Sequence, residues 1–134
     1  MAKWIYLVAT NCADPSREKE FNDWYSNTHQ PDLVQRTPGM VRAARYELAR
    51  VMPPGKTGSG MPKFADGPKA SEVPKFLAVY EFESDDIDQA LADCRTVSLH
   101  LGDEGRMNPL PVIVSRIAYR EISPPRQKDS SQKK

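Results

Sequence analysis

The chain has 134 residues, the length of one ordinary domain, and 39% of them are apolar, which is enough to build a core. Nineteen basic residues nearly balance eighteen acidic ones, and a net charge of +1 argues against binding to nucleic acid or to a membrane surface. Two distant cysteines and only short apolar runs argue against a disulfide framework and a membrane span, so we expect a cytoplasmic protein with a small-molecule partner.

The chain opens with a predicted strand and a predicted amphipathic helix. Residues 3–10, KWIYLVAT, are β-branched, aromatic and apolar on both faces, so this strand should be covered on both sides. Asp14 is a suitable N-cap and Pro15 suits the first helical position, so the helix should begin near residue 15. Side chains at i, i+3, i+4 and i+7 form its core-facing stripe: Phe21, Trp24, Tyr25 and Thr28.

A proline predicts an interruption of this helix. Pro31 disfavours helical geometry in the preceding residue, so the helix should break or kink at residues 29–30 before a second short helical turn. His29 would then lie at a helix end, where its side chain could be aimed at a ligand. Further on, Pro38 and Gly39 have the order that a type II turn requires.

The second half of the chain begins with a strand at about 40–50 and then loses all periodicity. Residues 52–74 contain five prolines and four glycines, and a loop of this length is typical of a lid, a binding loop or an insertion. The remaining segments are a strand at 75–83, a helix capped by Ser84 with a buried stripe of Ile87, Leu91, Cys94 and Leu101 that stops at Gly102, a strand at 112–122 and a disordered tail at 123–134.

The order strand-helix-strand, repeated once, predicts an α+β, ferredoxin-like domain over residues 1–122. This fold has a four-stranded antiparallel sheet with both helices on one face. Because the strands are apolar on both faces, the uncovered face needs another partner. A second copy of the chain is the simplest one, so we expect a homodimer through the sheet face.

The central stretch resembles the dimeric α/β-barrel superfamily and, within it, the EthD-like branch. The resemblance covers residues 3–122 as a topology and residues 20–46 as a motif. It rests on the strand WIYLVAT, on Phe21-x-x-Trp24-Tyr25-x-x-x-His29-x-Pro31 followed by Leu33, and on Pro38-Gly39. It implies two subunits that pack sheet against sheet into a barrel, each with a ligand cavity between its sheet and its helices. The loop at 52–74 departs from the compact members of the superfamily.

The residues of the motif suggest a site around His29. An unperturbed imidazole titrates near neutral pH and suits general acid/base chemistry, but His29 could instead only cap the carbonyl end of the first helix. Asp32 could orient the His29 ring or only stabilise the start of the next helix. The aromatic candidates could equally belong to the core. The residues expected to bind substrate are Tyr6, Trp24, Tyr25, Asp32 and Tyr80.

Members of the superfamily include polyketide cyclases, cofactor-free oxygenases, lactone isomerases and haem-degrading enzymes, so the fold alone does not select a reaction. We predict a cofactor-independent lyase or isomerase, such as a cyclase or dehydratase, that acts on a small, apolar, oxygenated ring compound with His29 as acid/base. No metal site is expected. The alternatives are a monooxygenase, cofactor-free or with haem iron on His29 or His100, and a non-catalytic binding protein.

Overall fold

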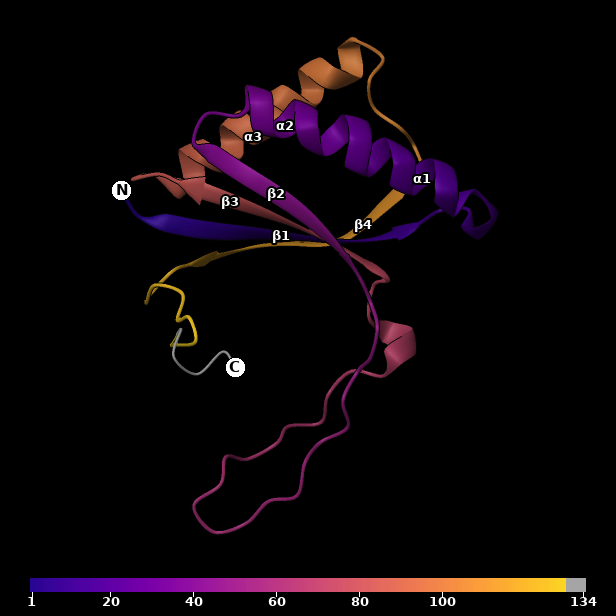
Figure 1. Ribbon diagram of the computed structural model, residues 1–134. Helices are drawn as coiled ribbons and strands as arrows, with labels where there is room; N and C mark the ends of the chain where they lie inside the picture. Colours follow the sequence, from indigo (N-terminus) through magenta and orange to yellow (C-terminus); the bar gives the residue numbers. More distant parts are fainter. Residues whose placement is uncertain (130–134) are drawn as a thin grey trace.

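The computed structural model describes residues 1–129 and consists of one antiparallel sheet covered on one face by helices (Figure 1). The strands lie in the order β2-β3-β1-β4, which is the ferredoxin-like topology, so the predicted α+β fold is confirmed. The elements are β1 (Lys3–Cys12), α1 (Glu18–Trp24), α2 (Gln30–Arg36), β2 (Met40–Glu47), β3 (Phe76–Glu83), α3 (Ile87–Asp103) and β4 (Pro111–Arg120).

Alternation along the strands separates a covered face from an open face. Tyr6 pairs with Tyr80 of β3 and with Ala118 of β4, and these three side chains point toward the helices. The main core lies between this face and the helices and is built from Phe21, Tyr25, Leu33, Tyr80, Phe82, Cys94 and Leu101. The covered face of the sheet therefore forms the floor of any cavity beneath the helices.

The predicted helix break at residues 29–30 is wrong. Gln30 has helical backbone angles, and a π-helical turn, Tyr25–His29, joins α1 to α2 without interruption. Pro31 lacks an N–H and would collide with a carbonyl in a regular helix, and the wider π turn relieves that conflict. The N–H of Gln30 accordingly bonds to the carbonyl of Tyr25, five residues earlier. The same turn buries the side chains of both Tyr25 and His29.

The turn predicted before β2 is correct, but the predicted ends of α3 are not. The predicted turn at Pro38-Gly39 is confirmed, because Gly39 has φ +80° and the N–H of Met40 bonds to the Thr37 carbonyl at 3.2 Å. Ser84 does not cap α3. Asp86 is the N-cap, since its backbone is extended and its carboxylate accepts the Gln89 N–H at 3.1 Å. Gly102 lies inside α3, which ends one residue later.

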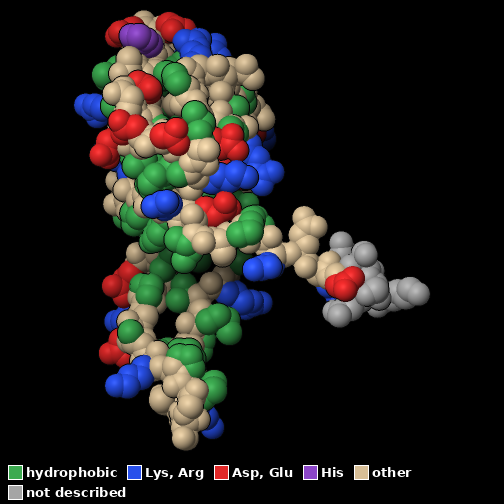
Figure 2. Space-filling view, turned by 90° about the vertical axis from the view of Figure 1, so that its left-hand side faces the viewer, with side chains coloured by type: hydrophobic (Ala, Val, Ile, Leu, Met, Phe, Trp, Pro, Cys, Tyr) green, Lys and Arg blue, Asp and Glu red, His purple; other side chains and the backbone are tan. Residues whose placement is uncertain are grey.

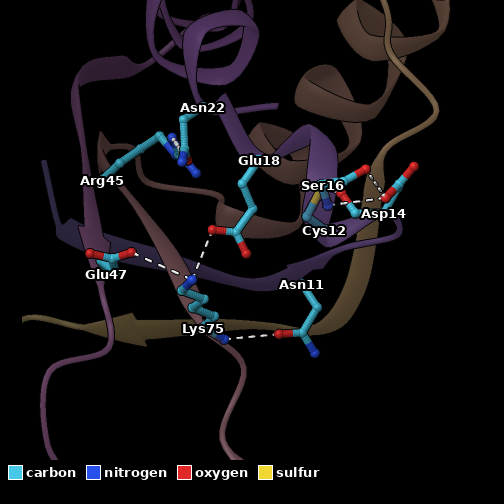
Figure 3. Close-up of polar contacts among 9 residues, drawn as sticks. All are labelled: Asn11, Cys12, Asp14, Ser16, Glu18, Asn22, Arg45, Glu47 and Lys75. Atoms are coloured by element: carbon cyan, nitrogen blue, oxygen red, sulfur yellow. Dashed lines mark hydrogen bonds and ion pairs between the residues drawn. The ribbon is translucent and has the colours of Figure 1, made fainter. Parts of the chain in front are cut away.

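Residues 48–75 form an arm that leaves the sheet on the side away from the helices (Figure 1). Its base is tied to the fold by the N–H of Leu48 on the Lys75 carbonyl at 2.7 Å and by Lys75, which bonds to Asn11 at 2.9 Å and to Glu18 at 2.8 Å (Figure 3). Beyond its base, hydrophobic side chains lie along the arm (Figure 2), and Met52 and Phe64 are among its exposed ones.

The face of the sheet opposite the helices carries exposed apolar side chains. Ile5 and Tyr119 pair across β1 and β4 and share this face, as do Leu7 and Ile117. No helix in residues 1–129 has the length and apolarity needed to cross a membrane. Of the predicted tail at 123–134, residues 123–129 have no helix or strand, and residues 130–134 lie outside the described part of the chain.

Candidate functional site

A cavity of about 600 Å³ lies between the covered face of the sheet, the π-helical turn and α3. Four of the six predicted site residues line it. These four residues are Tyr6 on β1, Tyr25 and His29 in the π-helical turn, and Tyr80 on β3. Trp24 and Asp32 are not part of its wall.

His29 faces the cavity as a buried, neutral imidazole. Its exposed fraction is 8%, and its Nδ1 atom is buried without a hydrogen-bond partner. Burial lowers the pKa of His29 to about 4, although the nearby charge of Asp32 opposes this shift. The ring is therefore uncharged at neutral pH, which corrects the expectation of an imidazole that titrates near pH 6.5. A ring nitrogen without a partner, on a residue of the cavity wall, can accept a hydrogen bond or a proton from a bound molecule that reaches it.

Trp24 lies behind the imidazole instead of in the cavity wall. Its indole is stacked on the His29 ring, with centroids 4.7 Å apart and planes 17° apart. Its Nε1–H donates to the carbonyl of Arg106 at 2.9 Å, which fixes the indole in place. Trp24 thus shields the imidazole from water and holds its plane, and the geometry gives it no contact with a ligand.

Asp32 does not orient His29 through a hydrogen bond. Its carboxylate accepts two hydrogen bonds from the guanidinium of Arg106, at 2.7 and 3.0 Å. These bonds hold the pKa of Asp32 below its ordinary value. The partner is 74 residues away in the sequence, so the local pattern around Asp32 gave no sign of it. Asp32 acts on His29 only through its charge, which raises the pKa of the imidazole.

The three tyrosines of the cavity are protonated phenols. Burial raises the pKa of each, and it raises that of Tyr80 well above its ordinary value, because Tyr80 is almost fully enclosed and lies near Tyr25. Arg116 lies near Tyr6, and its charge partly offsets the effect of burial on the pKa of Tyr6. Such hydroxyls can donate hydrogen bonds to a carbonyl or to a developing oxyanion of a ligand.

Arg45 is a residue of the site region that the sequence analysis did not single out. Its guanidinium lies over the ring of Tyr25, 4.3 Å from the centroid, and donates to Asn22 at 2.9 Å (Figure 3) and to Ser26 at 3.1 Å. It fixes the Tyr25 ring, and its charge helps to lower the pKa of His29. The signal in the sequence was a basic residue at an inward position of the strand.

Arg95 of α3 and Arg116 of β4 also line the cavity and were not predicted. Arg116 is the one charged residue in the mostly apolar run VIVSRIAY, and its register with Val8 places it on the covered face. A charge at an inward strand position was therefore a usable signal, whereas Arg95 looks like any other exposed residue of a helix. Within residues 1–129, no three His, Cys, Asp or Glu side chains converge on a possible metal position.

Comparison with known proteins supports the fold. No protein-family model matches the sequence, and no curated protein matches it either. Among solved structures, HapK from Hahella chejuensis aligns with a TM-score of 0.54 at 12% identity and covers 94% of this chain and 99% of its own. The chain has the fold of HapK.

An ethyl tert-butyl ether D (EthD) family protein from Bacillus halodurans C-125 aligns with a TM-score of 0.44 at 16% identity, over 91% of this chain and 100% of its own. At these identities the likeness concerns the arrangement of helices and strands. The comparison with HapK thus supports the predicted arrangement of helices and strands.

Proposed function

We propose that this protein binds a small, largely apolar, oxygenated ring compound in the cavity and transforms it without a cofactor, with His29 as the acid/base. The observation that supports this proposal is that His29 lies in the cavity wall, while its buried ring nitrogen Nδ1 has no hydrogen-bond partner within the described chain. A buried polar atom without a partner is costly, by about 1–3 kcal/mol. A ligand that bonds to Nδ1 removes that cost.

The chemistry follows from a neutral imidazole beside phenol donors. His29 takes a proton from a carbon next to a carbonyl group, while a tyrosine hydroxyl such as that of Tyr6 donates to the oxygen on which charge develops. Return of the proton to another carbon gives isomerisation, and departure of a hydroxyl group as water gives dehydration. Attack of the carbanion on a second carbonyl carbon of the same molecule, whose oxygen takes up the proton, gives cyclisation. In decarboxylation the carbanion forms instead by loss of CO₂, and an acid of the site then protonates it. General acid/base help of this kind contributes about 10²–10⁴-fold in rate.

A second function, non-catalytic binding of the same class of compound, is favoured by one specific observation. A group whose pKa lies at about 4 is a weak base at neutral pH. In a binding protein, Nδ1 would only accept a hydrogen bond from a ligand hydroxyl. The two functions differ in whether the bound compound is changed.

We further propose that the protein acts as a homodimer through the open face of the sheet. The exposed apolar side chains there, which include Ile5, Ile117 and Tyr119, form the kind of surface that a partner covers. The arm of residues 48–75 extends on the same side (Figure 1), so it lies where it would reach a second copy. The sheet of each subunit would then be covered on both faces, as the apolar pattern of the strands requires.

Untargeted mass spectrometry of host-cell extract tests the catalytic proposal. Extract is incubated with wild-type protein, with His29→Gln and with His100→Gln, which alters the exposed second histidine as a matched control. We expect a ring compound that wild type and His100→Gln deplete and His29→Gln leaves essentially unchanged. Equal depletion by all three proteins would remove His29 from the mechanism. Co-purification of the compound with wild type, without depletion, would select the binding function.

A further inference from the structure

We infer that the ligand of this cavity carries a carboxylate, which Arg95 and Arg116 bind. This inference rests on the proposed function, because it takes a small molecule in the cavity as given and specifies its charge. It goes beyond the apolar, oxygenated ring compound by adding an anionic group at a defined part of the wall.

The charged residues of the cavity wall are both basic. Arg95 and Arg116 both line it, from α3 above and from β4 in the sheet below, and no Asp or Glu is part of the wall. Elsewhere in residues 1–129, arginine and lysine side chains form seven ion pairs with carboxylates, and neither of these two arginines takes part in any of them. Two cations therefore share one hollow without a protein anion to balance them.

Arg116 lies near Tyr6 on the covered face of the sheet. Burial raises the pKa of Tyr6, which also lines the cavity and is half-buried on β1, and the charge of Arg116 opposes this rise. The guanidinium is a planar fork with five donors, and no ion pair with a carboxylate within residues 1–129 occupies them. A carboxylate is the acceptor that this fork matches best, through two parallel hydrogen bonds.

The rest of the wall determines the other part of the ligand. Apolar side chains from both layers, among them Val8, Leu33, Leu91 and Ile113, surround the remaining space. Both arginines are solvent-exposed, so a bound carboxylate would meet them at the open side of the cavity, where water partly screens the attraction. The wall therefore fits an apolar ring that bears one carboxylate, with the ring among the aliphatic side chains and the carboxylate at the arginines.

Two probes of the same shape separate charge from size. 1-Naphthoate has an aromatic ring and a carboxylate, and 1-naphthamide replaces the carboxylate by a neutral amide. Their dissociation constants are measured by isothermal titration calorimetry at neutral pH with wild type, Arg95→Gln, Arg116→Gln, the double variant and Arg120→Gln. Arg120 lies on the same strand as Arg116 and is not part of the cavity wall, so it is the matched control.

We expect wild type to bind 1-naphthoate about 10-fold more tightly than 1-naphthamide, the advantage of a charge-assisted hydrogen bond. Each single variant should weaken 1-naphthoate alone, the double variant should bind both probes equally, and Arg120→Gln should match wild type. Ala118→Trp, which fills the cavity from β4, should abolish binding of both probes.

Failure of the inference differs from failure of the proposed function. If wild type binds both probes equally, or if Arg120→Gln weakens 1-naphthoate as much as Arg116→Gln does, the carboxylate site is overturned while binding in the cavity stands. If neither probe binds, or if the Ala118→Trp variant binds both as wild type does, the cavity itself is not a ligand site and both proposals fall.

Discussion

The imidazole of His29 lies flat against the indole of Trp24, with ring centroids 4.7 Å apart and an interplanar angle of 17°. The ring of Tyr25 meets the imidazole edge-on at 5.1 Å. These two aromatic contacts help to keep water from the ring, and His29 is also a residue of the cavity wall. The contacts that desolvate the imidazole therefore also hold it at the cavity.

The stability of the protein should depend on pH through His29. Its folded-state pKa of about 4 lies below the ordinary 6.5, so the unfolded chain binds the proton more tightly. The stabilising contribution of the neutral ring is then fully present above pH 6.5 and is lost as the pH falls from 6.5 to 4, by up to about 3 kcal/mol. Urea unfolding at pH 7 and 4.5 should show a larger loss for wild type than for His29→Gln. Equal losses would contradict the buried, neutral ring.

Removal of the stacked indole should raise the pKa of His29. Trp24→Ala opens one face of the imidazole to water, so the pKa should move from about 4 toward 6.5, which NMR titration of the ring protons can follow. Trp4→Ala is the control, because its indole bonds to the Ser84 carbonyl at 3.0 Å and has no ring contact with His29. An unchanged pKa in Trp24→Ala would mean that the indole does not desolvate the ring.

Charge on the open face of the sheet should separate the proposed dimer. Ile117→Lys places an ammonium among the exposed apolar side chains of that face, where a sheet-to-sheet interface would have to bury it. Sedimentation velocity should show a dimer for wild type and a monomer for Ile117→Lys, with unchanged circular dichroism. Ile122→Lys, beyond the end of β4 and 94% exposed, should remain dimeric. A dimer that tolerates Ile117→Lys would use another surface.

The turn before β2 should not accept a side chain at Gly39. This glycine has φ +80°, and an added Cβ would lie 2.9 Å from the Glu83 carbonyl oxygen at the end of β3. We expect Gly39→Ala to destabilise the protein by more than about 1 kcal/mol in urea unfolding. Gly67→Ala, in the arm, has nothing within 4 Å and should change the stability by less than about 0.5 kcal/mol. A neutral Gly39→Ala would show that the turn rearranges.

Much of the fold could be predicted because its signals are local. The β-branched and aromatic runs of β1 and β3 and the helical spacing of Phe21 and Tyr25 gave the correct order of elements and the buried side of the first helix. The inward faces of the strands were not predicted, because both faces are apolar. The same kind of local reasoning failed at Pro31. A proline usually ends a helix or kinks it, but here the π-helical turn before Pro31 accommodates the missing N–H and the proline ring, so the helix continues. That turn decides where His29 points.

The site could be predicted only where a residue's role does not depend on distant partners. His29, Tyr6, Tyr25 and Tyr80 were predicted and meet at one cavity. Asp32 was expected to contact His29 or a ligand because it lies three residues after His29. Its carboxylate instead accepts two hydrogen bonds from Arg106, which follows α3 in the chain. The desolvation of the imidazole and the approach of Arg95 to Arg116 across the cavity arise from tertiary packing, although the inward position of Arg116 on its strand was a signal in the sequence.

The central claim is that a neutral imidazole offers a free nitrogen to the ligand of the cavity. Nitrogen-15 NMR of the His29 ring, recorded between pH 8 and 5 with and without saturating 1-naphthamide, tests it most directly. The account predicts one protonated and one unprotonated nitrogen throughout this range, with a shift of the unprotonated nitrogen when the probe binds. Titration of the ring near pH 6.5 together with no response to a bound probe would contradict it.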